Sequence, residues 1–325
     1  MRTTTRRTFV KGAGACAALG PCAPALAQTR TIRLGDTSAL PIAWPIYIAD
    51  KKGYFREEGL AIESTYTNSN PAVAQQVVGG NFDIGVTTYE TGVRAIFGQA
   101  PLRITGSLMR AFPYVIMSSP DVKSPADMRG KTVVLPLAKS ILTVFWNRWL
   151  VENGLKPDEV DQVYDAATPN RFAALKSRAA QAAVLSQPFD WMAAADGFTK
   201  LLDLGARVRD FGFTAFVARQ DWTAKNPEAM KAFLRAVSRA VPFLYDPANR
   251  EECADILAPP TKMDRANALR AWDYYATELK PFDKSLDLPD RQIELLVGTL
   301  IEMGDFRAGE DYRPSRFVDS SFLPG

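Results

Sequence analysis

Apolar residues recur with two alternating periods over the first two thirds of the chain. Short runs in which every second residue is apolar predict strands, and longer stretches with apolar residues three or four positions apart predict helices. The predicted strands cover residues 31–37, 60–66, 82–87, 102–108, 114–119, 132–136, 160–164, 182–185, 200–204 and 213–219. Helices are predicted between them at 44–52, 71–78, 89–97, 140–153, 170–178 and 189–196. This alternation is typical of parallel sheets with helices on both faces, so we expect an α/β fold with two such units.

The pattern changes near residue 227, where strand-like alternation ends. Apolar stripes at helical spacing, separated by Pro or Gly, predict helices at 227–245, 250–257, 265–278 and 290–303. Pro242 lies inside the first of these, and we expect it to kink or end that helix because it lacks a backbone donor. The chain therefore closes with a helical region.

The stretch 48–63 predicts a rigid corner between a helix and a strand. Gly53 and Gly59 suit the left-handed conformation that ends a helix or makes a tight turn. Tyr54 and Phe55 lie between these two glycines, and we expect the aromatic pair to pack into a core.

Composition indicates how many domains the chain can form and which kinds of partner it can bind. The chain has 325 residues, 47% of them hydrophobic, which is enough for two domains with sizeable cores. Lys and Arg number 39 against 36 Asp and Glu, but Arg2, Arg6, Arg7 and Lys11 all precede the first acidic residue. The remainder is close to neutral and has no basic stripe, which argues against a nucleic-acid partner.

Residues 1–27 have the features of a twin-arginine signal peptide. The segment 5–11, TRRTFVK, carries the paired arginines, a modest apolar stretch follows, and an Ala-Leu-Ala cleavage signal ends at Ala27. We expect export to the periplasm with cleavage after Ala27. Cys16 and Cys22 raise the alternative of a lipoprotein, but neither has the neighbours that lipid attachment requires.

The numbers of histidines and cysteines limit the catalytic, metal-binding and disulfide chemistry that the chain can have. Histidine is absent, with a count of 0, which removes His-based triads and most zinc sites. Cys253 is the one cysteine left after the predicted cleavage, so we expect no disulfide within the mature chain. No cofactor motif and no metal site are expected.

Five motifs in order resemble those of the substrate-binding proteins of ABC transporters, in the nitrate/sulfonate/taurine and SsuA/THI5-like branch. Their positions are 49–62, 80–83, 124–135, 153–163 and 172–188. The first matches the family pattern A-x-x-x-G-Y-F-x-x-x-G-L at Ala49, Gly53, Tyr54, Phe55, Gly59 and Leu60. In the last, Arg178 and Gln181 replace the usual Gly and Asp.

The resemblance implies a two-lobed type II periplasmic-binding-protein fold, each lobe a mainly parallel sheet flanked by helices. Lobe 1 would comprise 28–115 and 216–325, and lobe 2 would comprise 116–215. Two chain crossings, near 113–117 and 211–216, would form the hinge of a Venus-flytrap closure around ligand. The implied protein is a monomer without catalysis or cofactor that delivers its ligand to an ABC permease in the inner membrane.

Ligands of such lobes bind beyond the carboxyl ends of parallel strands, where helix N-termini offer free N–H groups. The candidate ligand-binding residues at these positions are Asp36, Ser38, Trp44, Asn70, Thr88, Glu90, Lys139, Ser140, Arg171 and Gln187.

These candidates point to different ligand chemistries. Trp44 is expected either to stack on a planar ligand or to cover its helix, and Asn70 either to cap a helix or to contact ligand. Glu90 favours a ligand with N–H donors or positive charge. Lys139 and Arg171, like the helix N-terminus capped by Ser140, favour an anion, and surface charge is the alternative for the two basic residues.

The sequence therefore predicts a periplasmic solute-binding protein for a small organic solute, namely a sulfonate, an aromatic acid or a pyrimidine-like compound. One alternative is a ligand-sensing module for a membrane receptor. Another is an enzyme on the same scaffold, with Asp36 or Glu90 as acid or base. The pyrimidine synthase of the resembling family consumes its own histidine, in a loop where this chain has Ala43-Trp44-Pro45. The lack of histidine excludes that reaction but not pyrimidine binding.

Overall fold

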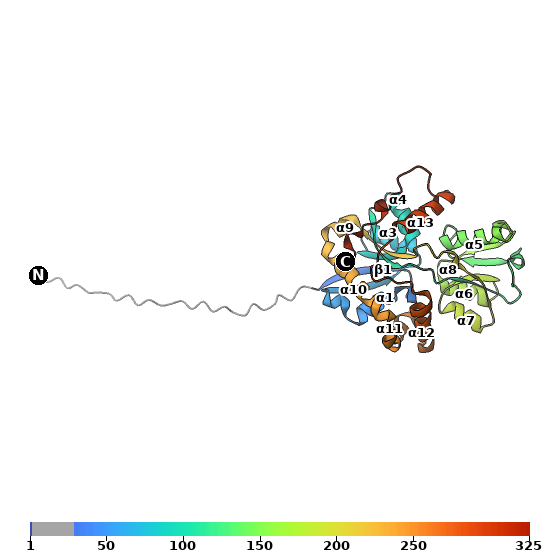
Figure 1. Cartoon of the computed structure of the whole chain (residues 1–325), viewed down its shortest axis with the longest axis horizontal. Coiled ribbons are helices and arrows are strands. Elements are labelled where there is room, and N and C mark those ends of the chain that lie inside the picture. Colours follow the sequence, from blue (N-terminus) through green and yellow to red (C-terminus); the bar gives the residue numbers. More distant parts are fainter. Residues whose placement is uncertain (2–28) are drawn as a thin grey trace.

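The computed structural model describes Met1 and residues 29–325. Except for Met1, the predicted signal peptide, its cleavage site and Cys16 and Cys22 lie outside the described residues. Two sheet-centred units lie side by side, and the C-terminal helices pack around the first of them (Figure 1).

The first sheet has the strand order β2-β1-β3-β10-β4. Its strands are β1 (Arg30–Asp36), β2 (Leu60–Tyr66), β3 (Ile84–Thr88), β4 (Leu102–Met109) and β10 (Thr214–Arg219). β1 pairs in parallel with β2 and β3, whereas β10 is antiparallel to β3 and β4. β10 alone therefore runs against the others, and the carboxyl ends of β1, β2 and β3 share one edge.

The second sheet repeats this topology with the order β7-β6-β8-β5-β9. Its strands are β5 (Val115–Ser118), β6 (Thr132–Leu135), β7 (Asp161–Tyr164), β8 (Ala182–Leu185) and β9 (Thr199–Asp203). β6 pairs in parallel with β7 and β8, and β5 is antiparallel to β8 and β9. Each sheet thus has a mainly parallel arrangement with one reversed strand, as the resemblance implied.

The chain passes between the sheets twice. It leaves the first sheet after β4 and enters the second at β5, and it returns from β9 to β10. Each reversed strand is the first strand after a passage, so it enters the new sheet from the side that faces the other one. The passages overlap the two predicted crossings.

Helices flank both sheets, and their bounds follow the predicted pattern closely. Those before β10 are α1 (Trp44–Lys51), α2 (Tyr54–Glu57), α3 (Asn70–Val78), α4 (Tyr89–Phe97), α5 (Ile141–Glu152), α6 (Thr168–Lys176), α7 (Phe189–Ala195) and α8 (Leu204–Arg207). Those after it are α9 (Gln220–Lys225), α10 (Pro227–Tyr245), α11 (Arg250–Thr261), α12 (Arg265–Trp272), the π-helical η5 (Asp273–Leu279), α13 (Asp290–Glu302) and α14 (Pro314–Phe317). Short 3₁₀ turns are η1 (Pro41–Ala43), η2 (Pro125–Met128), η3 (Pro157–Glu159), η4 (Pro247–Asn249) and η6 (Ser320–Phe322).

Three helix predictions need correction. The helix predicted at 250–257 continues through Pro259 and Pro260 to Thr261. α10 continues through Pro242 to Tyr245, because a proline in the last turn costs only the backbone bonds near the helix end. The helix predicted at 265–278 changes to π-helical geometry at Asp273. The short helices α2, α8, α9 and α14 were not predicted, since four to six residues carry too little periodicity.

The predicted corner at 48–63 is confirmed. Gly53 has φ 77° and Gly59 has φ 74°, both left-handed. Phe55 is 1% exposed and stacks on Phe233 of α10, with ring centroids 5.4 Å apart. The corner thereby fastens α1 and β2 to the C-terminal helices.

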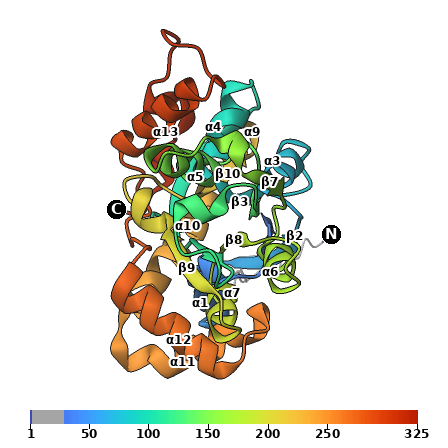
Figure 2. The ribbon, with the colours of Figure 1, turned by 90° about the vertical axis from the view of Figure 1, so that its right-hand side faces the viewer.

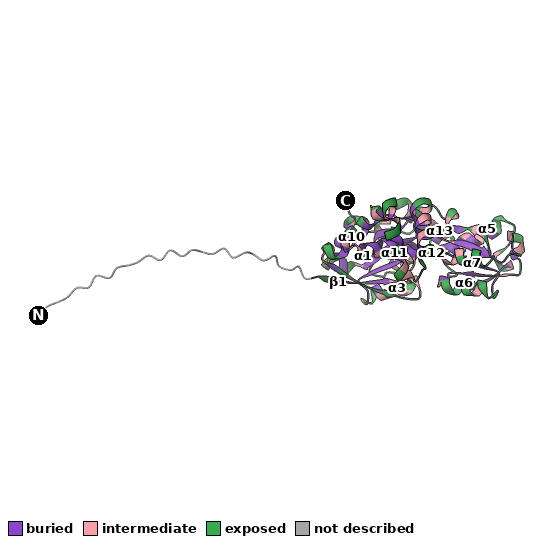
Figure 3. Ribbon diagram, turned by 90° about the horizontal axis from the view of Figure 1, so that it is seen from below, coloured by how far each residue is buried: buried purple, intermediate pink, exposed green. Residues whose placement is uncertain are grey.

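The core lies on the sheet faces and under the helices. Every residue of β3 is buried, and the helices expose only their outer sides (Figure 3). In Figure 2 the second unit lies in front of the first, with α12 and α11 below and α13 above. Within the described residues, no helix has the length and apolar character needed to cross a membrane.

Candidate ligand-binding site

A cavity of about 210 Å³ lies between the two sheets. From the first sheet it is lined by residues that follow β1, β2 and β3, and from the second by residues that follow β6 and β7. The two passages between the sheets complete the wall with Phe112, Tyr114 and Phe213, and Thr214 at the start of β10 adjoins them. The cavity therefore occupies the place where parallel strands of both sheets end, as the sequence predicted.

Seven of the ten candidate residues line this cavity. They are Asp36, Ser38, Asn70, Thr88, Glu90, Ser140 and Arg171. Their convergence from distant parts of the chain makes them one site, and whether they contact ligand stays a prediction.

Glu90 connects the two units across the cavity. Its side chain lies in the first turn of α4, and its Oε2 accepts a hydrogen bond from the backbone N–H of Ile141 at 2.7 Å. Ile141 is the first residue of α5, on the opposite unit. Burial raises the pKa of Glu90 to about 7, although Arg94 Nη1 lies 3.8 Å away and the Ile141 N–H favours the charged form.

Asp36 ends β1 and brings a second carboxyl to the cavity. Its Oδ1 accepts from the backbone N–H of Thr37 at 2.6 Å and from the Thr37 hydroxyl at 3.4 Å. Within residues 29–325, Asp36 forms no ion pair with a Lys or Arg side chain. Burial raises its pKa to about 7, although the hydrogen bonds from Thr37 and the backbone N–H of Ser38 favour the charged form.

A family model described as NMT1/THI5 like matches residues 41–249 of this chain. The chain belongs to the NMT1/THI5-like family. The family resemblance inferred from the five motifs is thereby confirmed.

Among relatives of this NMT1/THI5-like protein, a binding protein of Brucella abortus is 27% identical over 223 residues, covering 68% of each chain. A 4-amino-5-hydroxymethyl-2-methylpyrimidine phosphate synthase of Aspergillus parasiticus is 24% identical over 278 residues, covering 76% of this chain and 77% of the synthase.

Solved structures show the same fold. The periplasmic nitrate-binding protein NrtA from Synechocystis PCC 6803 matches with a TM-score of 0.78 and 19% identity, covering 91% of this chain and 87% of NrtA. The alkanesulfonate-binding protein SsuA from Xanthomonas axonopodis pv. citri, bound to MOPS, matches with a TM-score of 0.69 and 16% identity, covering 87% of this chain and 95% of SsuA. The predicted periplasmic-binding-protein fold is therefore confirmed.

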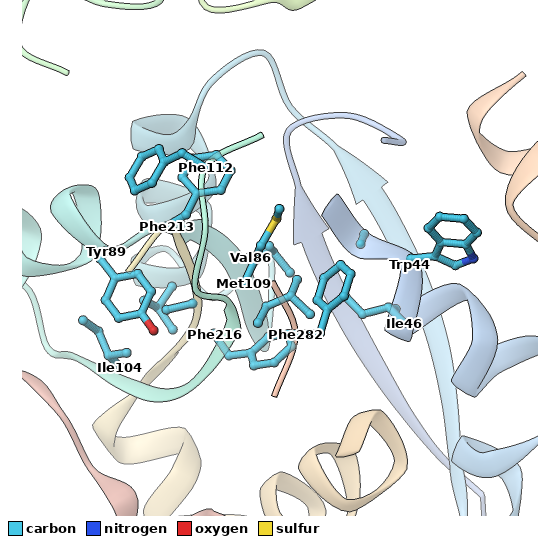
Figure 4. Close-up of a cluster of buried hydrophobic side chains, with 14 of the residues drawn as sticks. Trp44, Ile46, Val86, Tyr89, Ile104, Met109, Phe112, Phe213, Phe216 and Phe282 are labelled. Atoms are coloured by element: carbon cyan, nitrogen blue, oxygen red, sulfur yellow. The ribbon is translucent and has the colours of Figure 1, made fainter. Parts of the chain in front are cut away.

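Trp44 does not line the cavity of this NMT1/THI5-like protein, which corrects the prediction of a stacking wall. It is 0% exposed, and its Nε1 donates to the backbone oxygen of Cys253 at 3.1 Å. Its ring meets Tyr275 edge to face at 6.1 Å. Figure 4 shows Trp44 on α1, set apart from Phe112 and Phe213. The C-terminal helices cover the N-terminal end of α1, and local sequence does not show that contact.

The aromatic walls of the cavity come instead from the passages. The rings of Phe112 and Phe213 are 4.5 Å apart, and those of Tyr114 and Phe213 are 5.6 Å apart. Sequence reasoning missed these three residues as ligand candidates. Tyr114 and Phe213 lie in the predicted crossings and Phe112 lies directly before one. This position was the available signal, since crossings between two lobes border the space between them.

Lys139 and Gln187 also lie outside the cavity. Lys139 forms an ion pair with Asp305 and faces a neighbouring surface depression. Gln187 is 2% exposed and donates to Asp190 Oδ2 at 3.0 Å, beside a separate cavity between α7 and α12. Both were predicted as ligand contacts, and both have protein partners in the structure.

Arg171 lines the cavity, but its guanidinium is used internally. It is 1% exposed, and it donates to the backbone oxygens of Val184, Asp165 and Ala166 at 2.7–2.8 Å. Nη2 also donates to the Thr168 hydroxyl at 2.8 Å. Burial lowers the pKa of Arg171. The predicted anion partner therefore ties the loop before α6 to β8.

The helix caps divide between confirmed and corrected predictions. Ser140 is the N-cap of α5, as predicted, and accepts from Thr143 N–H at 3.1 Å. The cap of α3 is Ser69 rather than Asn70. Asn70 Oδ1 instead accepts from the backbone N–H of Thr88 at 3.2 Å, which joins the start of α3 to the end of β3.

Proposed function

We propose that this chain is a periplasmic solute-binding protein that holds a small organic solute between two lobes and delivers it to an ABC permease. Lobe 1 would comprise 28–115 and 216–325, and lobe 2 would comprise 116–215. The observation that carries the proposal is the cavity of about 210 Å³ at the strand ends of both sheets.

The volume and the lining residues of the cavity limit the size and chemistry of the solute that it can hold. An apolar cavity of about 150 Å³ holds benzene, so the larger volume here suits one six-membered ring with polar substituents. Phe112, Tyr114 and Phe213 supply flat apolar walls, and Asp36, Ser38 and Thr88 supply polar contacts. These features fit a substituted aromatic or heterocyclic solute better than a bare inorganic ion.

Closure around the solute follows from the contacts between the proposed lobes. Glu90 on α4 meets Ile141 on α5, Lys139 pairs with Asp305, and Arg148 pairs with Glu302. A ligand that bridges the lobes would add to these contacts and shift the population toward the closed state. Export by the twin-arginine route, cleavage after Ala27 and a monomeric state belong to the same proposal.

A thermal-shift screen of aromatic amines, aromatic acids, sulfonates and pyrimidines tests this function. We expect a compound that binds to raise the Tm of the unaltered protein. The same compound should not raise the Tm of Ser38→Trp, where the indole fills the cavity. Ser177→Trp, on the exposed end of α6, is the matched control and should keep binding. The proposal fails if no compound raises Tm, or if binding persists unchanged in Ser38→Trp.

An enzyme is the second candidate, favoured by the two cavity carboxyls whose pKa values are raised to about 7. Recovery of the ligand distinguishes the two functions. A binding protein returns its ligand unchanged when the complex is denatured, whereas an enzyme returns a product whose amount grows with incubation time.

A further inference from the structure

We propose that the cavity selects a small organic cation, such as an aryl amine or an arylamidinium, and rejects oxyanions. This inference rests on the proposed function and names the ligand class of the same site. It follows from the charges that line the cavity, namely Asp36, Glu90 and Arg171.

Asp36 supplies the group that would pair with the cation. Both of its hydrogen bonds from Thr37 go to Oδ1. The backbone N–H of Ser38 also favours the charged form of the carboxyl, but among the described residues the carboxyl has no basic partner. A carboxylate withdrawn from water is stabilised by a positive group beside it, and a cationic ligand would supply that group.

Glu90 removes the place where an oxyanion would bind. The N-terminus of α5 lies at the cavity and offers backbone N–H groups, which commonly bind carboxylates, sulfonates and phosphates. Here the carboxylate of Glu90 already accepts the Ile141 N–H at 2.7 Å, and Ser140 accepts from Thr143. An anionic ligand would have to displace a buried carboxylate of the protein and then lie next to it.

Arg171 does not make the cavity favour an oxyanion over a cation. An arginine has five N–H donors and binds oxyanions best through two parallel bonds. Four hydrogen bonds already join Arg171 to three backbone oxygens and a hydroxyl. The guanidinium therefore cannot offer a free pair of donors to an anion.

The aromatic walls add to the preference for a cation. Phe112, Tyr114 and Phe213 form a cluster at the cavity, with adjacent ring centroids 4.5 and 5.6 Å apart. Aromatic faces carry partial negative charge and attract ammonium and amidinium groups. A flat aryl cation would be held by the rings and by Asp36 together.

Three planar probes of similar shape test the inference by calorimetry on the full chain: benzamidine, benzoate and benzenesulfonate. We expect benzamidine to bind about tenfold more tightly than either anion, or better. Asp36→Asn should weaken benzamidine about tenfold, whereas Asp50→Asn, an exposed carboxyl on α1, should leave the affinity unchanged.

The outcomes separate this inference from the proposed function. Tighter binding of benzoate or benzenesulfonate would overturn the inference while the binding function stands. If Asp36→Asn does not fold, the ratio of benzamidine to benzoate affinity in the unaltered protein decides the matter. Failure of every probe here and in the wider screen would overturn both proposals.

Discussion

At the scale of single residues, the site is defined by two carboxyls whose surroundings differ. Asp36 accepts hydrogen bonds from its own loop, whereas Glu90 accepts one from another helix and has Arg94 nearby. The sequence identified both residues, because Asp36 lies at the end of a predicted strand and Glu90 lies just after another. It did not show that Glu90 occupies the N-terminus of α5, since the two meet only in the folded chain.

The raised pKa values of Asp36 and Glu90 make stability depend on pH. Each is raised to about 7, above the value of about 4 for an unfolded carboxyl. Between these values the folded protein binds more protons than the unfolded chain, so the free energy of unfolding falls as pH rises and levels off above about pH 7.

We therefore expect the Tm of the ligand-free protein to fall between about pH 5 and about pH 7.5. The double variant Asp36→Asn with Glu90→Gln should show a smaller fall. Asp190, whose pKa burial also raises, would account for part of the remainder. A Tm that rises across this range would contradict the assignment of the two raised pKa values.

Removal of Glu90 should open the site to anions. In Glu90→Ala the Ile141 N–H loses its acceptor, and Arg94 loses a nearby carboxylate. We expect benzoate affinity, measured by calorimetry, to rise about tenfold because the N-terminus of α5 becomes free. Glu152→Ala, which removes an exposed carboxylate paired with Arg207 on the same unit, should leave benzoate affinity unchanged. An equal gain of benzoate affinity in both variants would show that the loss of any negative charge, rather than the freeing of the α5 N-terminus, causes it.

At the scale of helices and strands, local pattern predicted most of the fold. The bounds of β2, α4 and α10 agree with those predicted, because each has clear periodicity and Gly or Pro at its borders. The reversed strands β5 and β10 were predicted as strands but not placed in their sheets, since pairing depends on distant partners. The prediction that Trp44 contacts ligand was wrong for the same reason. The elements that cover Trp44, α11 and η5, lie more than 200 positions away in the chain.

The packing role of Trp44 predicts a loss of stability without a loss of recognition. Trp44→Ala removes a fully buried indole and its hydrogen bond to Cys253 O. We expect urea denaturation to show a loss of about 3–5 kcal/mol, with ligand affinity preserved in the folded protein. Trp191→Ala, at a half-buried position on α7, should cost less. A large change in affinity with little change in stability would restore Trp44 as a ligand contact.

At the scale of the whole molecule, hydrogen bonds, ion pairs and aromatic contacts join the proposed lobes. The Tyr275 hydroxyl donates to Gln187 Oε1 at 3.3 Å, and the Arg270 guanidinium lies 4.5 Å from the ring centroid of Trp191. Three further contacts involve charged side chains. The pairs of Lys139 with Asp305 and of Arg148 with Glu302 involve exposed basic side chains, and such pairs contribute about 1 kcal/mol or less. The bond from Ile141 N–H to Glu90 is buried and has a charged acceptor, which makes it the stronger contact. The balance between open and closed forms should therefore depend mainly on Glu90.

This ranking predicts how the ligand-free shape responds to substitution. In X-ray scattering, Glu90→Ala should increase the radius of gyration more than Lys139→Ala or Arg148→Ala, because of the three it alone removes a buried hydrogen bond to a charged acceptor. Arg207→Ala is the matched control, since its partner Glu152 lies on the same unit and the pair spans no gap between lobes. A saturating ligand should restore the compact form of each variant, because a ligand that bridges both lobes replaces the lost contact. An equal expansion in Arg207→Ala would mean that the change reflects partial unfolding instead of hinge opening.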